Sequence, residues 1–121
     1  MFKETLEAII ERTEGSLGAL IMGLDGIAVE RLLKEAGQEA NLDVAAAEFT
    51  SLVRSAQKAG KDTGLGSLRE LMISLDDAVL IVRLLGPDYF VVLAISPDGN
   101  LGRARFELRK AELQLSKEFA V

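Results

Sequence analysis

The sequence of 121 residues contains no cysteine and no histidine. Without cysteine, neither a disulfide framework nor thiolate chemistry is possible. Without histidine, the chain lacks the usual general base near neutral pH and the commonest metal ligand in proteins. These two absences make an enzyme the least expected class of protein. We expect no catalytic residue, no cofactor and no metal site.

Long apolar runs and an excess of positive charge are also missing. No run approaches the roughly 20 apolar residues that span a bilayer, and Glu4 and Glu7 interrupt the apolar core that a secretory signal would need. Acidic residues outnumber basic ones by 19 to 14, so the net charge is −5. Phosphate binding depends on clustered lysine and arginine, so nucleic acid is not an expected partner. We expect a cytoplasmic protein with a solvated acidic surface and no membrane insertion.

Apolar residues, at 49% of the chain, are plentiful enough for one domain spanning residues 1–121 with a real core. The sequence pattern in the first part of that domain predicts a helix followed by a hairpin. Apolar residues recur at helical spacing over residues 2–14, and Gly15 ends that helix. The stretches 17–24 and 27–33 predict strands. Asp25-Gly26 between them predicts a two-residue type I′ turn.

A loop over residues 34–41 precedes a second helix at 42–60, for which Asn41 is the expected N-cap. Gly60 and Gly64 are expected to terminate this helix. Its apolar side chains cover a broad arc of roughly 140°. The residues of the arc are Leu42, Ala45, Ala46, Phe49, Leu52, Val53, Ala56 and Ala59.

The sequence pattern in the last half of the chain predicts a three-stranded meander followed by a final helix. The three strands are expected at 68–75, 78–85 and 89–95. Asn100 is the expected N-cap of that helix, which runs to about residue 119. Strands 17–24, 78–85 and 89–95 are apolar at both parities, so helices must cover both faces of the sheet centre. The mixed-polarity strands 27–33 and 68–75 are the expected edges.

The fold class that follows is α/β (α+β). We expect a three-layer sandwich around a five-stranded, mainly antiparallel sheet, in the order α-β-β-α-β-β-β-α.

Three motifs that suggest chemistry have better structural explanations. Gly60-Lys61 resembles part of a phosphate-binding loop, but Ser55 and Asp62 stand where that loop needs glycine and serine or threonine. The aspartates lie where turns favour aspartate, with no spacing of a Ca²⁺ loop. Single arginines could act in phosphoryl transfer, although nothing distinguishes them from surface arginines. The aspartates are Asp25, Asp76, Asp77, Asp88 and Asp98, and the arginines are Arg54, Arg83, Arg103 and Arg105.

Two features favour self-association. The expected edge strand 68–75 has neither charge nor proline at its centre, so a second copy of the strand would satisfy its backbone groups. The arc of the 42–60 helix is wide enough to contact both a sheet and a second helix. We therefore expect a two-fold dimer, with a deeper monomer core as the alternative. The candidate dimer residues are Ala45, Phe49, Leu52, Ala56, Leu68, Leu71 and Ile73.

Phe106 and Leu113 lie away from the main apolar stripe of the last helix. They either pack on the first helix or form a patch for a partner.

The order helix, Asp-Gly hairpin, helix, three-stranded meander, helix resembles the Roadblock/dynein light-chain domain family. The resemblance rests on residues 17–29, the helix at 42–60 and residues 100–111, and it covers nearly the whole chain. It implies a non-enzymatic homodimer in which the 42–60 helices pack together and the 68–75 edges join two sheets. Such dimers serve as platforms for small Ras-like GTPases or as adaptor subunits.

The chain looks most like free-standing bacterial members of that family, some of which activate a partner GTPase. Such activators often carry terminal extensions, and this chain has almost none. The leading hypothesis is a scaffold that binds and regulates a small Ras-like GTPase. The alternatives are a structural adaptor without GTPase contact and a small-molecule sensor.

Overall fold

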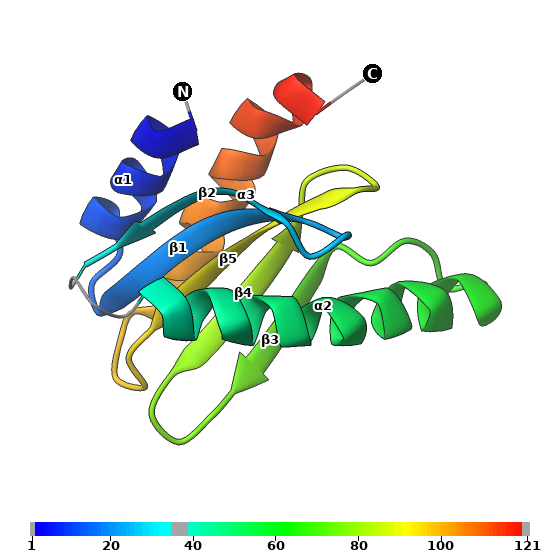
Figure 1. Ribbon diagram of the computed structural model, residues 1–121, viewed down its shortest axis with the longest axis horizontal. Helices are drawn as coiled ribbons and strands as arrows, with labels where there is room; N and C mark the ends of the chain where they lie inside the picture. Colours follow the sequence, from blue (N-terminus) through cyan, green and yellow to red (C-terminus); the bar gives the residue numbers. More distant parts are fainter. Residues whose placement is uncertain (1, 35–38, 120–121) are drawn as a thin grey trace.

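The computed structural model describes residues 2–34 and 39–119, which form three helices and one five-stranded sheet (Figure 1). The order of elements is the one expected from the sequence. In chain order they are α1 (Phe2–Arg12), β1 (Ser16–Gly23), β2 (Ala28–Leu33), α2 (Glu39–Asp62), β3 (Glu70–Ser74), β4 (Val79–Leu84), β5 (Tyr89–Ile95) and α3 (Leu101–Phe119).

The strands are arranged in the order β2-β1-β5-β4-β3, and every neighbouring pair is antiparallel. The apolar strand β5 lies at the centre, between β1 and β4. The mixed-polarity strands β2 and β3 lie at the edges, which confirms the expectation drawn from their composition. A central strand buried on both faces has to be apolar throughout, whereas an edge strand tolerates polar residues.

Helices α1 and α3 cover one face of the sheet, and α2 crosses the other (Figure 1). The first core lies between the sheet and the α1–α3 layer. Burying each of its large side chains stabilises the fold by roughly 1.5–3 kcal/mol. Its helical members are Leu6, Ile9, Ala104, Leu108, Ala111 and Leu115, and its largest sheet members include Ile21, Ile81, Leu93 and Ile95.

The second core lies between the sheet and α2. Phe90, on the central strand, is fully buried there, and Val53 of α2 is buried against the sheet. Phe49 of α2 packs beside it while partly exposed. In the described part of α2, only Val53 and Thr50 are buried, so much of the helix faces outward. The three-layer architecture is confirmed, but its α2 side is more open than its α1–α3 side.

The β1–β2 hairpin differs from the expected two-residue type I′ turn. Asp25 would need a positive φ in that turn, and no residue other than glycine has one in the described chain. The loop instead has three residues, Leu24–Gly26, closed by a hydrogen bond from the Gly23 N–H to the Ile27 carbonyl. Gly26 has a φ of 85°, and the Asp25 carboxylate accepts a hydrogen bond from the Ile27 N–H. The hairpin prediction is confirmed, and the turn type was wrong.

The bounds of α2 also differ from those expected. The helix begins at Glu39 rather than after Asn41, so Asn41 lies inside it and is not the N-cap. Glutamate and alanine are good helix formers, which favours a helix that starts earlier. The helix also runs through Gly60 to Asp62, and Gly64 then takes a φ of 72°. Of the expected loop at 34–41, residues 35–38 lie outside the described chain.

Helix α3 begins as expected. The Asn100 side-chain oxygen accepts a hydrogen bond from the backbone N–H of Arg103 at 3.0 Å, which is the geometry of an N-cap. Phe106 and Leu113 belong to neither core, and 54% and 73% of their surfaces are exposed. Of the two possibilities for this pair, the structure shows the exposed patch. In the parts of the chain that the structure describes, no helix is long and apolar enough to cross a bilayer.

Candidate interaction surface

Strand β3 presents a free backbone edge. Within the described residues it pairs with β4 alone, in a register that sets Leu71 opposite Val82 and Ile73 opposite Leu80. Leu71 and Ile73 point toward the α2 side, where they pack against the second core while remaining partly exposed. Leu75, at the same parity just after the strand, is exposed. The edge therefore combines unpaired backbone groups with apolar side chains, a combination that favours pairing with another strand.

Ala56 of α2 lines one groove together with Leu68 and Glu70, so this helix lies close to the β3 edge. Leu52 is 48% exposed, and Val44 is exposed about two turns earlier. Ala45 and Ala56 are half-buried, and small side chains there allow another helix to approach closely. We call this set of residues the α2–β3 surface. Its members are Val44, Ala45, Phe49, Leu52, Ala56, Leu68, Leu71, Ile73 and Leu75.

The seven residues proposed from the sequence fall into two groups. Phe49, Leu68, Leu71 and Ile73 meet on the second core, so they support the fold of the single chain as well as bordering the surface. Leu52 points away from that core and is exposed to solvent. Ala45 and Ala56 are half-buried.

Two further members of the surface were missed. Leu75 could have been found from strand alternation, since it shares the parity of Leu71 and Ile73. Val44 does not belong to the apolar arc that the sequence predicts for α2, so that pattern could not identify it. The side chains of two residues of the arc, Leu42 and Ala46, lie outside the described part of the chain.

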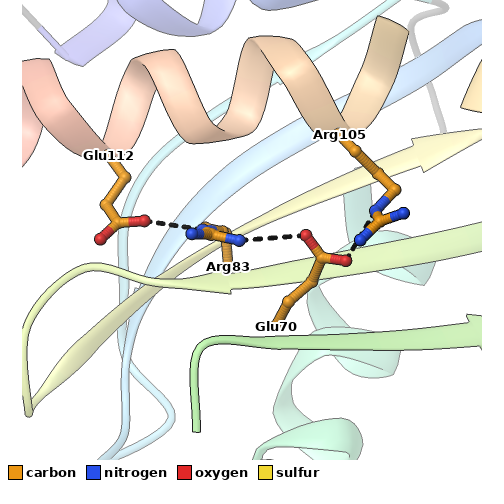
Figure 2. A network of polar contacts seen from close by, with 4 residues as sticks. All are labelled: Glu70, Arg83, Arg105 and Glu112. Atoms are coloured by element: carbon orange, nitrogen blue, oxygen red, sulfur yellow. Dashed lines mark hydrogen bonds and ion pairs between the residues drawn. The ribbon is translucent and has the colours of Figure 1, made fainter. Parts of the chain in front are cut away.

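An ion-pair network on the opposite face ties β3 to the rest of the fold (Figure 2). The guanidinium of Arg83 on β4 contacts Glu112 of α3 at 2.6 Å and Glu70 of β3 at 3.2 Å. Arg105 of α3 contacts the other oxygen of Glu70 at 2.8 Å. Arg83 is only 13% exposed, so these contacts compensate for taking its charge out of water. The network joins residues far apart in sequence, and no local pattern could have predicted it.

The four arginines considered for phosphoryl transfer all have structural partners. Arg83 and Arg105 belong to the network just described. Arg103 contacts the buried carboxylate of Glu107 at 2.6 Å, and Arg54 donates a hydrogen bond to the Leu24 carbonyl. Arg54 thereby ties α2 to the β1–β2 turn, and the Thr50 hydroxyl supports the same contact through the Met22 sulfur at 3.7 Å.

The glycine-rich loop after α2 closes that helix. The backbone N–H groups of Leu65 and Gly66 both donate to the Gly60 carbonyl, at 3.0 and 3.2 Å. A side chain at Gly60 would place a Cβ atom 2.3 Å from the Gly66 carbonyl oxygen. These two amides are thus engaged in capping and are not directed at a phosphate. Beside the loop lies an open groove of about 800 Å³, lined by residues that include Gly60, Arg69 and Glu112.

Two of the turn aspartates serve local hydrogen bonding. Asp25 accepts the Ile27 N–H, and Asp98 accepts the Ser96 hydroxyl at 2.8 Å. Among the described residues, no three acidic side chains gather closely enough to hold a metal ion. Among the described residues, the α2–β3 surface is therefore the candidate interaction surface.

Comparisons with known proteins show the family to which the chain belongs. The family model for the Roadblock/LC7 domain matches residues 2–95. The structure of MglC from Myxococcus xanthus is 32% identical, with a TM-score of 0.73, and the match covers 97% of this chain and 98% of that one. A search of curated proteins gives no significant match.

Two more distant structures share the fold. A Roadblock/LC7 domain from Streptomyces avermitilis is 16% identical with a TM-score of 0.85, and the match covers 98% of this chain and 97% of that one. An MglB structure described as having a tetrameric arrangement is 22% identical with a TM-score of 0.84, over 95% of this chain and 85% of that one. With a family model over residues 2–95 and a relative at 32% identity over nearly its full length, this chain belongs to the Roadblock/LC7 domain family.

Proposed function

We propose that this protein is a non-catalytic homodimeric scaffold that binds and regulates a small Ras-like GTPase in the cytoplasm. The observation that carries the proposal is the α2–β3 surface, where an unpaired strand edge adjoins exposed apolar side chains. An exposed edge of this kind leaves backbone N–H and C=O groups without a partner strand. A second copy of the chain would supply that strand and cover the apolar side chains.

A two-fold axis beside β3 would pair this strand antiparallel with its copy. The two five-stranded sheets would then form one continuous sheet, and the unpaired backbone groups of both β3 strands would be satisfied. Leu71 and Ile73 already point toward the α2 side of the sheet. The same axis therefore brings the two α2 helices together across the joined sheets.

The dimensions of α2 support this arrangement. A helix of 24 residues is about 36 Å long, whereas five strands spaced at about 4.8 Å give a sheet roughly 19 Å wide. Because α2 crosses the strands, it extends past them (Figure 1). The part that projects has no sheet of its own chain to pack on, and in the dimer the partner would supply one.

The α3 helix belongs to the same proposed domain, although the family model ends before it. Ala104, Leu108 and Leu115 share the first core with Leu6 and Ile9 of α1. We therefore treat residues 1–121 as one Roadblock domain.

The GTPase role rests on the family and on the kind of surface present. The chain belongs to the Roadblock/LC7 family, and the resemblance drawn from the sequence implies a platform for small Ras-like GTPases or an adaptor subunit. In the proposed dimer the scaffold acts by shape, holding the switch loops of the GTPase in one of their conformations and so shifting the population of states. The glycine-rich loop at 60–66 caps α2, so the nucleotide in this account is bound by the GTPase.

The test is a pull-down from the source cells with tagged protein, in the presence of either GDP or a non-hydrolysable GTP analogue. We expect a Ras-like GTPase whose recovery differs between the two nucleotides, because switch loops differ in conformation between them. A Leu52→Glu variant, designed to weaken the dimer, should lose the GTPase in parallel. If partners are recovered but no GTPase is among them, the GTPase proposal is wrong and the structural adaptor replaces it.

A further inference from the structure

The outer face of α3 carries a second surface, on the opposite side of the sheet from the α2–β3 surface (Figure 1). Phe106 and Leu113 are both large, apolar and more than half exposed. They are seven positions apart, which is about two helical turns, so they lie on one side of the helix roughly 10 Å apart. The other side of the same helix is buried in the first core. Phe106 and Leu113 therefore lie outside the apolar stripe that α3 buries in the first core.

Basic side chains flank this pair. At 100° per residue, Arg103, Lys110 and Lys117 fall to one side of the line from Phe106 to Leu113, and Arg109 falls to the other. The Arg103 guanidinium lies 5.2 Å from the centre of the Phe106 ring and also contacts Glu107. Within the described residues, Arg109, Lys110 and Lys117 make no ion pair. In a chain of net charge −5, this face is locally positive.

From this combination we infer that the outer face of α3 binds an acidic amphipathic helix of a partner protein. Apolar side chains of the partner would pack on Phe106 and Leu113. Its glutamates or aspartates would pair with Arg109, Lys110 and Lys117, which have no partner within the described chain. Complementary charge selects such a segment over a neutral or basic one.

The neighbouring helix argues for a narrow occupant. Helix α1 packs beside α3 in the same layer and carries the exposed acidic residues Glu4, Glu7 and Glu11. An anionic membrane is a plane and would meet α1 together with α3, so the acids of α1 would oppose it. A single helix about 10 Å across can follow α3 alone. Since the α2–β3 surface lies across the sheet, both surfaces can be occupied at once.

The probe is a fluorescein-labelled synthetic helix of about 20 residues, roughly 30 Å long, with leucine on one stripe and glutamate beside it. The control probe has lysine in place of every glutamate. Binding to the full chain is followed by fluorescence anisotropy. A first variant combines Phe106→Ser with Leu113→Ser, and a second combines Arg109→Glu with Lys110→Glu. The matched control combines Lys58→Glu with Lys61→Glu, the same change of charge placed on α2.

We expect saturable binding of the acidic helix that weakens by about tenfold or more in both α3 variants and stays unchanged in the α2 control. Binding should also fall as salt is added, because charge pairing contributes to it. Circular dichroism shows whether each variant keeps its fold, and the variants change only surface side chains.

Several results would overturn the inference. They are no saturable binding up to about 500 µM probe, equal binding of the lysine probe, or undiminished binding by the α3 variants. Binding to phosphatidylserine vesicles without binding to the acidic helix would assign the face to membranes instead. None of these results depends on whether the chain dimerises through α2 and β3.

Discussion

At the scale of single residues, Asn100 stabilises α3 by capping its first turn. Its side-chain oxygen accepts the Arg103 N–H, an amide at the helix start that has no partner within the helix. Asn100→Ala should lower the free energy of unfolding by about 1 kcal/mol, measured by urea denaturation. Asn100→Asp should retain most of the stability because aspartate caps as well as asparagine. Gln114→Ala, on the exposed surface of the same helix, is the control and should change stability by less than about 0.5 kcal/mol. An equal loss in both alanine variants would show that the cap is not what matters.

The residues of the ion-pair network should contribute very unequally. Arg83 is nearly buried between two carboxylates, whereas the Arg105 side chain is 55% exposed. Arg83→Ala leaves Glu70 and Glu112 without their shared cation and should lower the free energy of unfolding by about 2 kcal/mol. Arg105→Ala should cost about 0.5 kcal/mol or less, because water solvates and screens an exposed pair. Thermal and urea unfolding of the two variants side by side would measure the difference. Similar losses would contradict the role given to Arg83.

At the scale of elements, α3 has one face for the fold and another for solvent. Leu108 is fully buried between α3 and the sheet, whereas Leu113 is 73% exposed. Leu108→Ala should therefore lower the free energy of unfolding by about 2–5 kcal/mol. The same substitution at Leu113 should change it by less than about 0.5 kcal/mol. Both leucines lie in the same helix and lose the same atoms, so unfolding experiments on the two variants isolate the effect of burial. A large loss at Leu113 would mean that its face is packed in the native protein.

Elements were predictable from sequence where one local pattern determines the structure. The apolar stretches 17–24, 78–85 and 89–95 identified the inner strands, and the mixed composition of 27–33 and 68–75 identified the edges. Elements were misjudged where two local solutions compete. Asp-Gly fits either a two-residue or a three-residue loop, and only the pairing of Gly23 with Ile27 decides between them.

The surfaces were only partly predictable for a different reason. A helical arc shows that residues are apolar, but it does not show whether the same chain covers them. Of the α2 arc, Val53 is buried and Leu52 is exposed, a distinction that depends on the crossing of α2 over the sheet. The contacts of Glu70 with Arg83 and Arg105 depend on tertiary structure in the same way.

At the scale of the whole molecule, the sheet separates two surfaces with different characters. The α2–β3 surface is apolar and includes a free strand edge, which suits a copy of the same chain. The outer face of α3 is apolar and basic, which suits an acidic partner. We propose that the α2–β3 surface forms the homodimer and that the outer face of α3 binds the acidic partner. A substitution on one surface should leave the binding function of the other unchanged.

Leu52→Glu tests this separation. Leu52 is 48% exposed in the single chain, so glutamate there should fold normally. In the proposed dimer each copy would place an unpaired charge in an apolar interface, which should raise the dissociation constant by about 100-fold or more. Leu113→Glu, on the face of the sheet away from the proposed interface, is the matched control and should dimerise as the unaltered chain does. Sedimentation velocity over a concentration series would measure both. Loss of the dimer in both variants would contradict the assignment of the interface to α2 and β3.

The mass of the unaltered protein in solution tests the central claim most directly. Light scattering coupled to gel filtration, with the protein at about 50 µM, should give 26.0 kDa, twice the chain mass of 13.0 kDa. The value should persist in high salt, because the proposed interface is apolar and is closed by backbone hydrogen bonds. A mass of 13.0 kDa under these conditions would contradict the account, since the α2–β3 surface would then be open in the working protein.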